Sequence, residues 1–144
     1  EGRDGVFHDI PAALPALLHA RKAQQRAAAV GFDWPDLDGP LAKVREELAE
    51  LETELADQTP PPPETEPRAG VVAEIGDLLF TIVNVARRVN VDPELALRGT
   101  TARFVDRIEE AERLAAADGR DWRQLTLDEQ ERYYQSAKVN HLGS

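Results

Sequence analysis

The sequence predicts an all-α fold, a bundle of about five helices. Apolar residues recur at steps of three and four in several segments, which is the spacing of one face of an α-helix. Glycine and proline residues separate these segments, as expected for the breaks between helices. No segment alternates apolar and polar residues as a half-buried strand does. With 144 residues, the chain fits a single domain spanning residues 1–144.

Composition limits the classes of function. Acidic residues outnumber basic ones by 27 to 17, a formal net charge of −10, which argues against binding to nucleic acid or to an anionic membrane. Cysteine is absent, which excludes thiolate metal sites and cysteine nucleophiles. No uninterrupted apolar run reaches the roughly 20 residues of a membrane span, and no signal peptide is evident. We therefore expect a cytoplasmic protein. Because methionine is absent even at position 1, we expect a piece of a longer protein.

The first half of the chain predicts two helices. An Ala- and Leu-rich segment predicts a helix over residues 11–30, with Pro11 or Pro15 in its opening turns and Gly31 ending it. A second helix is predicted over residues 40–57. Its apolar residues step by three and four and form a core stripe: Leu41, Val44, Leu48, Leu51 and Leu55. A separate arc of the same helix is polar and mostly acidic.

The second half predicts three more helices. Residues 58–69 are rich in proline and predict an exposed loop, since proline lacks an N–H and fixes φ. A third helix follows over residues 71–89, and its wide apolar face is interrupted by one polar stripe: Glu74, Asp77, Thr81, Asn84 and Arg88. Asp92 and Pro93 begin a fourth helix that ends near residue 117. Thr126 and Glu129 form a capping-box signature before a last helix, which ends near residue 138.

Two acidic pairs on the second and third helices indicate a metal site. Glu47 and Glu50 are three residues apart, as are Glu74 and Asp77, so each pair shares a helix face. Four carboxylates brought together repel one another unless a cation lies between them, and Mg²⁺ or Mn²⁺ is the natural choice for such ligands. The alternative is a solvated acidic surface, which is common on helices.

Other chemistries fit the sequence less well. The three histidines stand in no Glu-x-x-His pattern, which argues against a di-iron bundle. No ligand set suits zinc, and no GxxxxGK[ST] loop is present for phosphate. Neither of the two serines has a plausible base nearby.

These motifs, in this order, resemble the MazG family. The resemblance rests on Val30-Gly31-Phe32-Asp33-Trp34-Pro35, Lys43-Val44-x-Glu46-Glu47-x-x-Glu50 and Glu74-Ile75-Gly76-Asp77-Leu78-Leu79-Phe80-x-x-x-Asn84-x-Ala86-Arg87, and it runs from about residue 14 to 104. It implies a helical bundle completed as a homodimer, with the metal site between two paired helices. It also implies Mg²⁺-dependent cleavage of a nucleoside triphosphate to the monophosphate and pyrophosphate.

The resemblance also assigns roles to individual residues. The family's metal ligands fall on Glu47, Glu50, Glu74 and Asp77. Its further acid falls on Glu46, which we expect to orient or deprotonate the attacking water, and Lys43 matches a lysine that contacts phosphate. The substrate-binding positions fall on Asn84, Arg103 and Arg107. Ala73 and Thr101 depart from the family pattern and leave catalytic strength or substrate preference open.

The base of the nucleotide is the least specified part of the substrate. Amide groups and aromatic faces near the first helix are the candidates for binding it: Gln24, Gln25, Phe32 and Trp34. Trp34 is an equally good packing residue for the end of a bundle. We expect broad tolerance of NTPs and dNTPs, including clearance of damaged nucleotides. The alternatives are a non-catalytic helical dimerisation or scaffold module and a dUTPase-like specialist of the same superfamily.

Overall fold

The computed structural model describes residues 5–57 and 59–142, and within these ranges every regular element is helical. The all-α prediction is therefore confirmed. The chain divides into two compact units, one ending at Glu94 and the other beginning at Leu95. The elements, in chain order, are α1 (Ala16–Ala29), α2 (Asp38–Glu54), α3 (Ala69–Arg88), α4 (Pro93–Ala117), the 3₁₀ turn η1 (Trp122–Gln124) and α5 (Leu127–Leu142).

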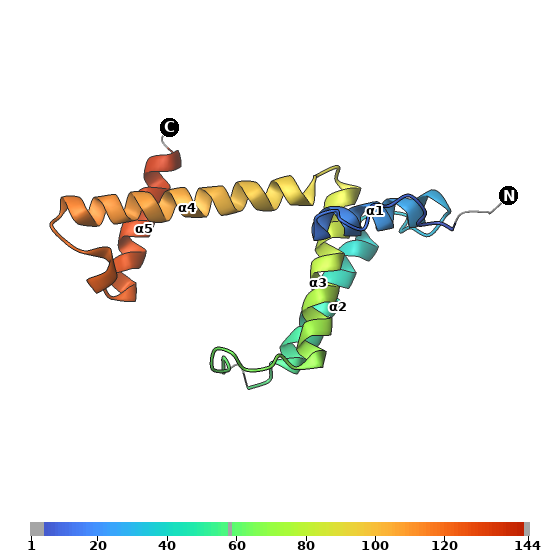
Figure 1. Ribbon diagram of the computed structural model, residues 1–144, viewed down its shortest axis with the longest axis horizontal. Coiled ribbons are helices and arrows are strands. Elements are labelled where there is room, and N and C mark those ends of the chain that lie inside the picture. Colours follow the sequence, from blue (N-terminus) through green and yellow to red (C-terminus); the bar gives the residue numbers. More distant parts are fainter. Residues whose placement is uncertain (1–4, 58, 143–144) are drawn as a thin grey trace. The chain divides into compact units, whose positions relative to one another are not determined.

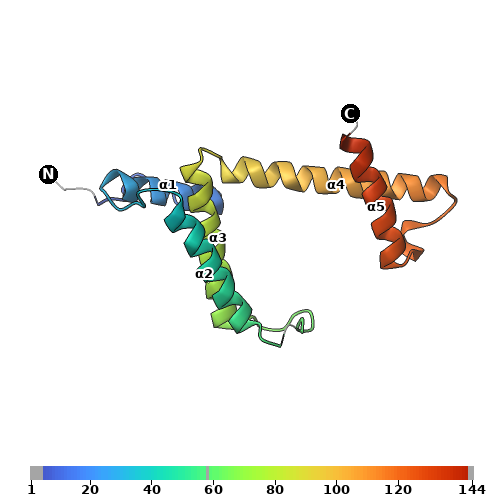
Figure 2. The same cartoon turned by 180° about the vertical axis from the view of Figure 1, so that it is seen from behind.

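In the first unit, α3 packs along α2 and also contacts α1. Both views show α2 and α3 side by side, with the proline-rich loop at their shared end (Figures 1 and 2). Residues 59–68 of this loop contain neither helix nor strand, as their prolines predict. Gln58 lies outside the described residues. The pairing of α2 with α3 brings the two acidic segments together.

The helix boundaries differ from the predicted ones by a few residues. α1 begins at Ala16, immediately after Pro15, so Pro11 lies outside the helix. Gly31 adopts φ 98°, a left-handed conformation that glycine tolerates and that ends α1 as predicted. α2 begins at Asp38 and ends at Glu54, short of the predicted residue 57.

In the second unit, α5 crosses α4 in both views (Figures 1 and 2). The rings of Phe104 and Tyr134 lie 6.3 Å apart, centroid to centroid. The capping box before α5 is confirmed. The Thr126 backbone N–H donates to the Glu129 side chain at 3.0 Å, and the Glu129 backbone N–H donates to Thr126 Oγ1 at 3.2 Å. The sequence did not predict η1, which lies in the loop between the two helices.

The apolar faces of α2 and α3 are only partly covered by the rest of the chain. In the predicted core stripe of α2, Leu48 is 44% exposed and Leu41 is 39% exposed. On α3, Ile75, Leu79 and Ile82 are also exposed. Periodicity correctly located these faces, but a helix face that looks like core in the sequence is not necessarily buried within one chain.

α3 is the one helix among the described residues that is long and apolar enough to cross a membrane, judged by length and composition alone. A core helix of a water-soluble protein passes the same test. The polar stripe of α3 and its packing against α1 and α2 fit a helix within a bundle.

Candidate metal centre and adjacent cavity

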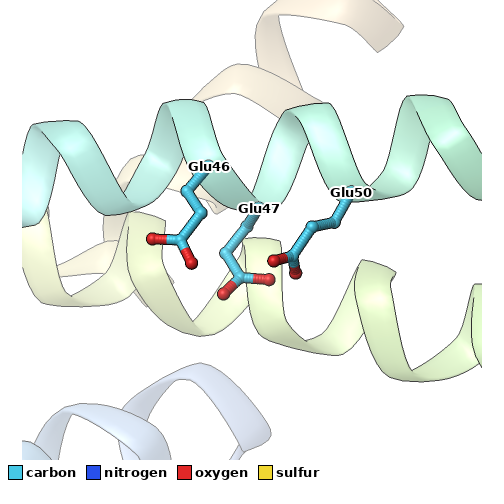
Figure 3. A group of neighbouring side chains, drawn as sticks. All are labelled: Glu46, Glu47 and Glu50. Atoms are coloured by element: carbon cyan, nitrogen blue, oxygen red, sulfur yellow. The ribbon is translucent and has the colours of Figure 1, made fainter.

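Three carboxylates of α2 lie together. Glu46, Glu47 and Glu50 each offer an oxygen atom, and these atoms lie within 4.8 Å of one another. The side chains leave the helix on the same side, with Glu47 between the other two (Figure 3). Their spacing along the helix explains this arrangement, since residues three and four apart are neighbours on its surface.

α3 contributes two further carboxylates. Glu74 and Asp77 form a second group with Glu47, again with oxygen atoms within 4.8 Å of one another. Glu47 belongs to both groups and therefore joins the acids of α2 to those of α3. We call Glu47, Glu50, Glu74 and Asp77 the carboxylate cluster. The four residues that the sequence predicted as metal ligands thus lie side by side on two paired helices.

The residues present fit a divalent cation. Glu47 is only 5% exposed, and the atoms Glu47 Oε2 and Glu74 Oε2 are buried with no hydrogen-bond partner within the described part of the chain. Leaving a carboxylate oxygen buried and unpaired is unfavourable. Carboxylate oxygens are the ligands that Mg²⁺ and Mn²⁺ prefer, so a hard cation would satisfy both orphaned atoms.

Charge within the carboxylate cluster is unevenly balanced. Burial, together with the hydrogen bonds and negative charges of Glu50 and Glu47, raises the pKa of Glu74 to about 7. The hydrogen bond from Lys43 lowers the pKa of Glu47, since Lys43 Nζ lies 3.1 Å from Glu47 Oε1. The same bond raises the pKa of Lys43, which stays protonated. Lys43 therefore supplies one positive charge at the edge of an otherwise acidic cluster.

Glu46 differs from its neighbour Glu47 in exposure. Its side chain is 55% exposed, and its Oε1 atom lies 3.3 Å from Lys43 Nζ. Glu46 is accessible to water beside the carboxylate cluster, which suits the predicted role of orienting or deprotonating a water molecule. That role remains a prediction.

A cavity of about 600 Å³ lies within the first unit, which is a size typical of small-molecule sites. Lys43 lines it and also contacts Glu47, so the cavity adjoins the carboxylate cluster. Trp34 and Asn84, both predicted to bind substrate, line the same cavity. Its other aromatic lining residues are Phe7, Phe32 and Phe80. The arrangement combines apolar flat surfaces with a few polar groups.

Trp34 stands at the wall of this cavity rather than buried in the bundle, since it is 45% exposed. Its ring packs directly over Gly39 of α2. A Cβ atom at position 39 would lie 2.3 Å from Cε3 of the ring, far inside normal contact distance. Only glycine at position 39 allows this close approach.

An ionic network holds the loop that carries Trp34, and the sequence did not predict it. Asp33 accepts hydrogen bonds from Arg87 at 2.6 and 3.3 Å, and Arg88 lies 3.2 Å from the same carboxylate. Arg88 also donates to the Trp34 carbonyl oxygen. The Arg87 hydrogen bond lowers the pKa of Asp33 to about 2. Asp33 belongs to the Gly31-Phe32-Asp33-Trp34 motif, but nothing in the sequence indicated that it would pair with Arg87 and Arg88, 54 and 55 positions away.

Arg103 and Arg107 belong to the second unit. Arg103 Nη2 donates to Thr100 Oγ1 at 3.0 Å. Arg107 Nε is buried without a hydrogen-bond partner among residues 5–57 and 59–142. Their expected contacts with the triphosphate remain predictions.

Comparison with known proteins identifies relatives over most of the chain. A Thermotoga maritima protein named nucleoside triphosphate pyrophosphohydrolase/pyrophosphatase MazG is 42% identical over 125 residues, which are 87% of this chain and 45% of that protein. An Escherichia coli (strain K12) protein named nucleoside triphosphate pyrophosphohydrolase is 38% identical over 146 residues, 99% of this chain and 52% of that protein. The chain thus spans about half the length of these curated relatives. No family model matches the chain. The similarity to these relatives, over 87% and 99% of this chain, confirms the predicted resemblance to MazG proteins.

Proposed function

We propose that this domain hydrolyses nucleoside triphosphates to the monophosphate and pyrophosphate with the help of a divalent cation. The observation that carries the proposal is the close approach of Glu47, Glu74 and Asp77, where two buried carboxylate oxygens have no hydrogen-bond partner among the described residues. A cavity of ligand size adjoins these acids. The names of the relatives from T. maritima and E. coli support the same activity.

The cation in this proposal is Mg²⁺, with Mn²⁺ as a substitute, and the carboxylate cluster would hold it. When bound, such a cation neutralises phosphate charge and lowers the pKa of a water molecule, so that water becomes a better nucleophile. Glu46 orients this water or accepts its proton. Lys43 binds a phosphate oxygen; its place in the cavity lining and the contact of its ammonium group with Glu47 support this role.

The remaining groups act on the substrate. Asn84 and Trp34 bind the nucleoside in the cavity whose wall they form. Arg103 and Arg107 stabilise the negative charge that develops on the departing pyrophosphate. Because no covalent nucleophile is assigned, water attacks phosphorus directly.

The substrates we propose are canonical NTPs and dNTPs together with damaged nucleotides. Removing these from the cytoplasmic pool would be a house-cleaning role. Flat apolar walls with few polar groups support broad acceptance of bases, because most of the contact would come from ring faces.

A second copy of the chain is the proposed partner. The apolar faces of α2 and α3 remain exposed in one chain, and burying such faces is the main driving force for association. A homodimer in which these faces meet would complete a helical bundle around the two carboxylate clusters.

A pyrophosphate-release assay over canonical, deoxy and oxidised nucleotides tests the proposal. We expect Mg²⁺-dependent release by the wild type and none by Glu47→Gln or Asp77→Asn, with helical circular dichroism retained. Glu52→Gln is the matched control, because Glu52 is an exposed acid of α2 outside both groups of converging acids. Full turnover by either cluster variant would contradict the mechanism. Hydrolysis confined to dUTP would indicate the dUTPase-like specialist, and no release from any nucleotide would favour the scaffold module.

A further inference from the structure

The side-chain amide of Asn84 has a fixed orientation. Arg87 donates to Asn84 Oδ1 from Nε at 3.0 Å and from Nη2 at 2.8 Å. Both Arg87 groups are N–H donors, so the Asn84 atom that they contact must be an acceptor. That atom is the amide oxygen, because the amide nitrogen is itself a donor. The Nδ2 group therefore takes the other position. No acceptor bonds Nδ2 among the residues that the structure describes.

Arg87 is itself held in place from its other side. Its side chain is 11% exposed, and Asp33 binds the guanidinium through both carboxylate oxygens. A bidentate pair of this kind fixes the plane of the guanidinium. Arg87 therefore links the loop that carries Trp34 to the amide of Asn84. Trp34 and Asn84 both line the cavity.

A second amide in the same cavity is also oriented and is incompletely satisfied. Gln24 is 7% exposed and donates from Nε2 to the Phe80 carbonyl oxygen at 2.9 Å. Its Oε1 atom is buried without a hydrogen-bond partner in the described part of the chain. A buried polar atom left without a partner calls for an explanation. A polar ligand close to this wall of the cavity provides one.

We propose that Arg87 is a positioning residue that holds Asn84 with its N–H groups toward the bound nucleotide, so that the cavity prefers a base with a carbonyl oxygen over one with an exocyclic amino group. This inference rests on the proposed function, since it takes the ligand of the cavity to be a nucleotide. The chemistry is complementary: an amide N–H donates to a carbonyl oxygen, whereas an amino group presents another donor to it. Arg87 also lines the cavity, and we assign its effect on base preference to the orientation of Asn84.

The ligands for the test are pairs that differ at one position of the base. The α,β-methylene analogues of UTP and CTP carry oxo and amino groups at the same ring position, as do the analogues of ITP and ATP. The methylene bridge replaces the bond that the proposed reaction breaks. Calorimetric titration in MgCl₂ then measures affinity without turnover. We compare affinities within whichever pair binds the wild type better. There we expect the oxo analogue to bind about tenfold more tightly than the amino analogue, because it gains one hydrogen bond from Asn84 where the amino group opposes donor to donor.

Three variants separate the positioning role from a structural one. Asn84→Asp keeps an oxygen for Arg87 but replaces the N–H donor by an acceptor, so we expect its preference to invert toward the amino member. Arg87→Met frees the amide to rotate, so we expect the affinity ratio to fall toward one. Arg88→Met is the matched control: Arg88 binds Asp33 and the Trp34 carbonyl oxygen, and within the described part of the chain it makes no hydrogen bond to Asn84. We expect it to keep the wild-type ratio.

Each other result would overturn the inference. An unchanged oxo-to-amino affinity ratio in Asn84→Asp would mean that Asn84 contacts the sugar or the phosphates and not the base. Equal loss of selectivity in Arg87→Met and Arg88→Met would show that Arg87 only holds the Trp34 loop in place and does not orient Asn84. Hydrolysis of NTPs by the wild type without oxo preference would contradict this inference alone. Absence of both binding and hydrolysis would contradict the proposed function and the inference with it.

Discussion

Replacing Gly39 by alanine should displace Trp34 without unfolding the domain. The added Cβ would lie 2.3, 2.6 and 2.9 Å from three atoms of the Trp34 ring. Because a carbon–carbon contact needs about 3.5 Å, the ring must move by about 1.2 Å or more. Trp34 is 45% exposed, so it has room to swing outward. The ring moves rather than the helix.

Stability and ligand binding should therefore change separately. Gly39 lies in the first turn of α2, where alanine is favoured over glycine by less than the about 1 kcal/mol of a helix interior, so this gain offsets only a small part of the strain of the contact. Stacking of a base on an aromatic ring contributes about 1–3 kcal/mol. Losing that stacking should weaken binding of a nucleotide by roughly tenfold or more, while the midpoint of chemical denaturation changes little.

The assay can observe the ring directly. The chain has two tryptophans, so a Trp122→Phe background leaves Trp34 as the only indole fluorophore. We expect Gly39→Ala to shift Trp34 emission and to lower the calorimetric affinity for the α,β-methylene analogue of UTP. Gly70→Ala is the matched control, because its Cβ would meet only the flexible carboxylate end of Glu54. Unchanged emission and unchanged affinity in Gly39→Ala would refute the assignment of Trp34 to the substrate.

Two further predictions concern stability and assembly. Because ion pairing with Arg87 lowers the pKa of Asp33 from 3.8 to about 2, the folded state gains stability above pH 3.8 and loses it as pH falls toward 2. Asp33→Asn should lower the free energy of unfolding at pH 7 by about 1 kcal/mol after allowance for solvent screening. Urea titrations at pH 7 and 2.5 should show the difference between wild type and variant shrink at the lower pH. An equal difference at both pH values would contradict this stabilising role of the ion pair. Leu79→Glu should convert the proposed dimer to a monomer in light scattering, because Leu79 lies on the exposed apolar face of α3. Leu127→Glu, at a 76% exposed position of α5, should not, and an unchanged mass for Leu79→Glu would exclude this face as the interface.

The helices and the acidic pairs were predictable because they depend on local sequence. Steps of three and four place residues on one face regardless of the rest of the fold, and the capping box at Thr126 uses residues only three positions apart. The same rule predicted that Glu47 and Glu50 would share one helix face, and Glu74 and Asp77 another. The structure places these acids together as expected.

The surroundings of Trp34 were not predictable in the same way. The bonds of Asp33 with Arg87 and the packing of the indole on Gly39 depend on how a loop returns to a helix. Many residue pairs in the sequence have the right chemistry for such contacts. Burial was also overestimated from periodicity, since Leu48 belongs to a regular apolar stripe yet is 44% exposed. A stripe shows which face is apolar, not what covers it.

Thermal melting with and without MgCl₂, at constant ionic strength, tests most directly whether the carboxylate cluster holds a cation. A ligand that binds only the folded state stabilises it by about 2.7 kcal/mol at a concentration of 100 times Kd, which corresponds to a rise in Tm of roughly 5–10 °C for a chain of this size. We predict this rise for the wild type and its loss in Asp77→Asn. No rise in the wild type, or an equal rise in both proteins, would contradict the assignment of the cluster as a metal site.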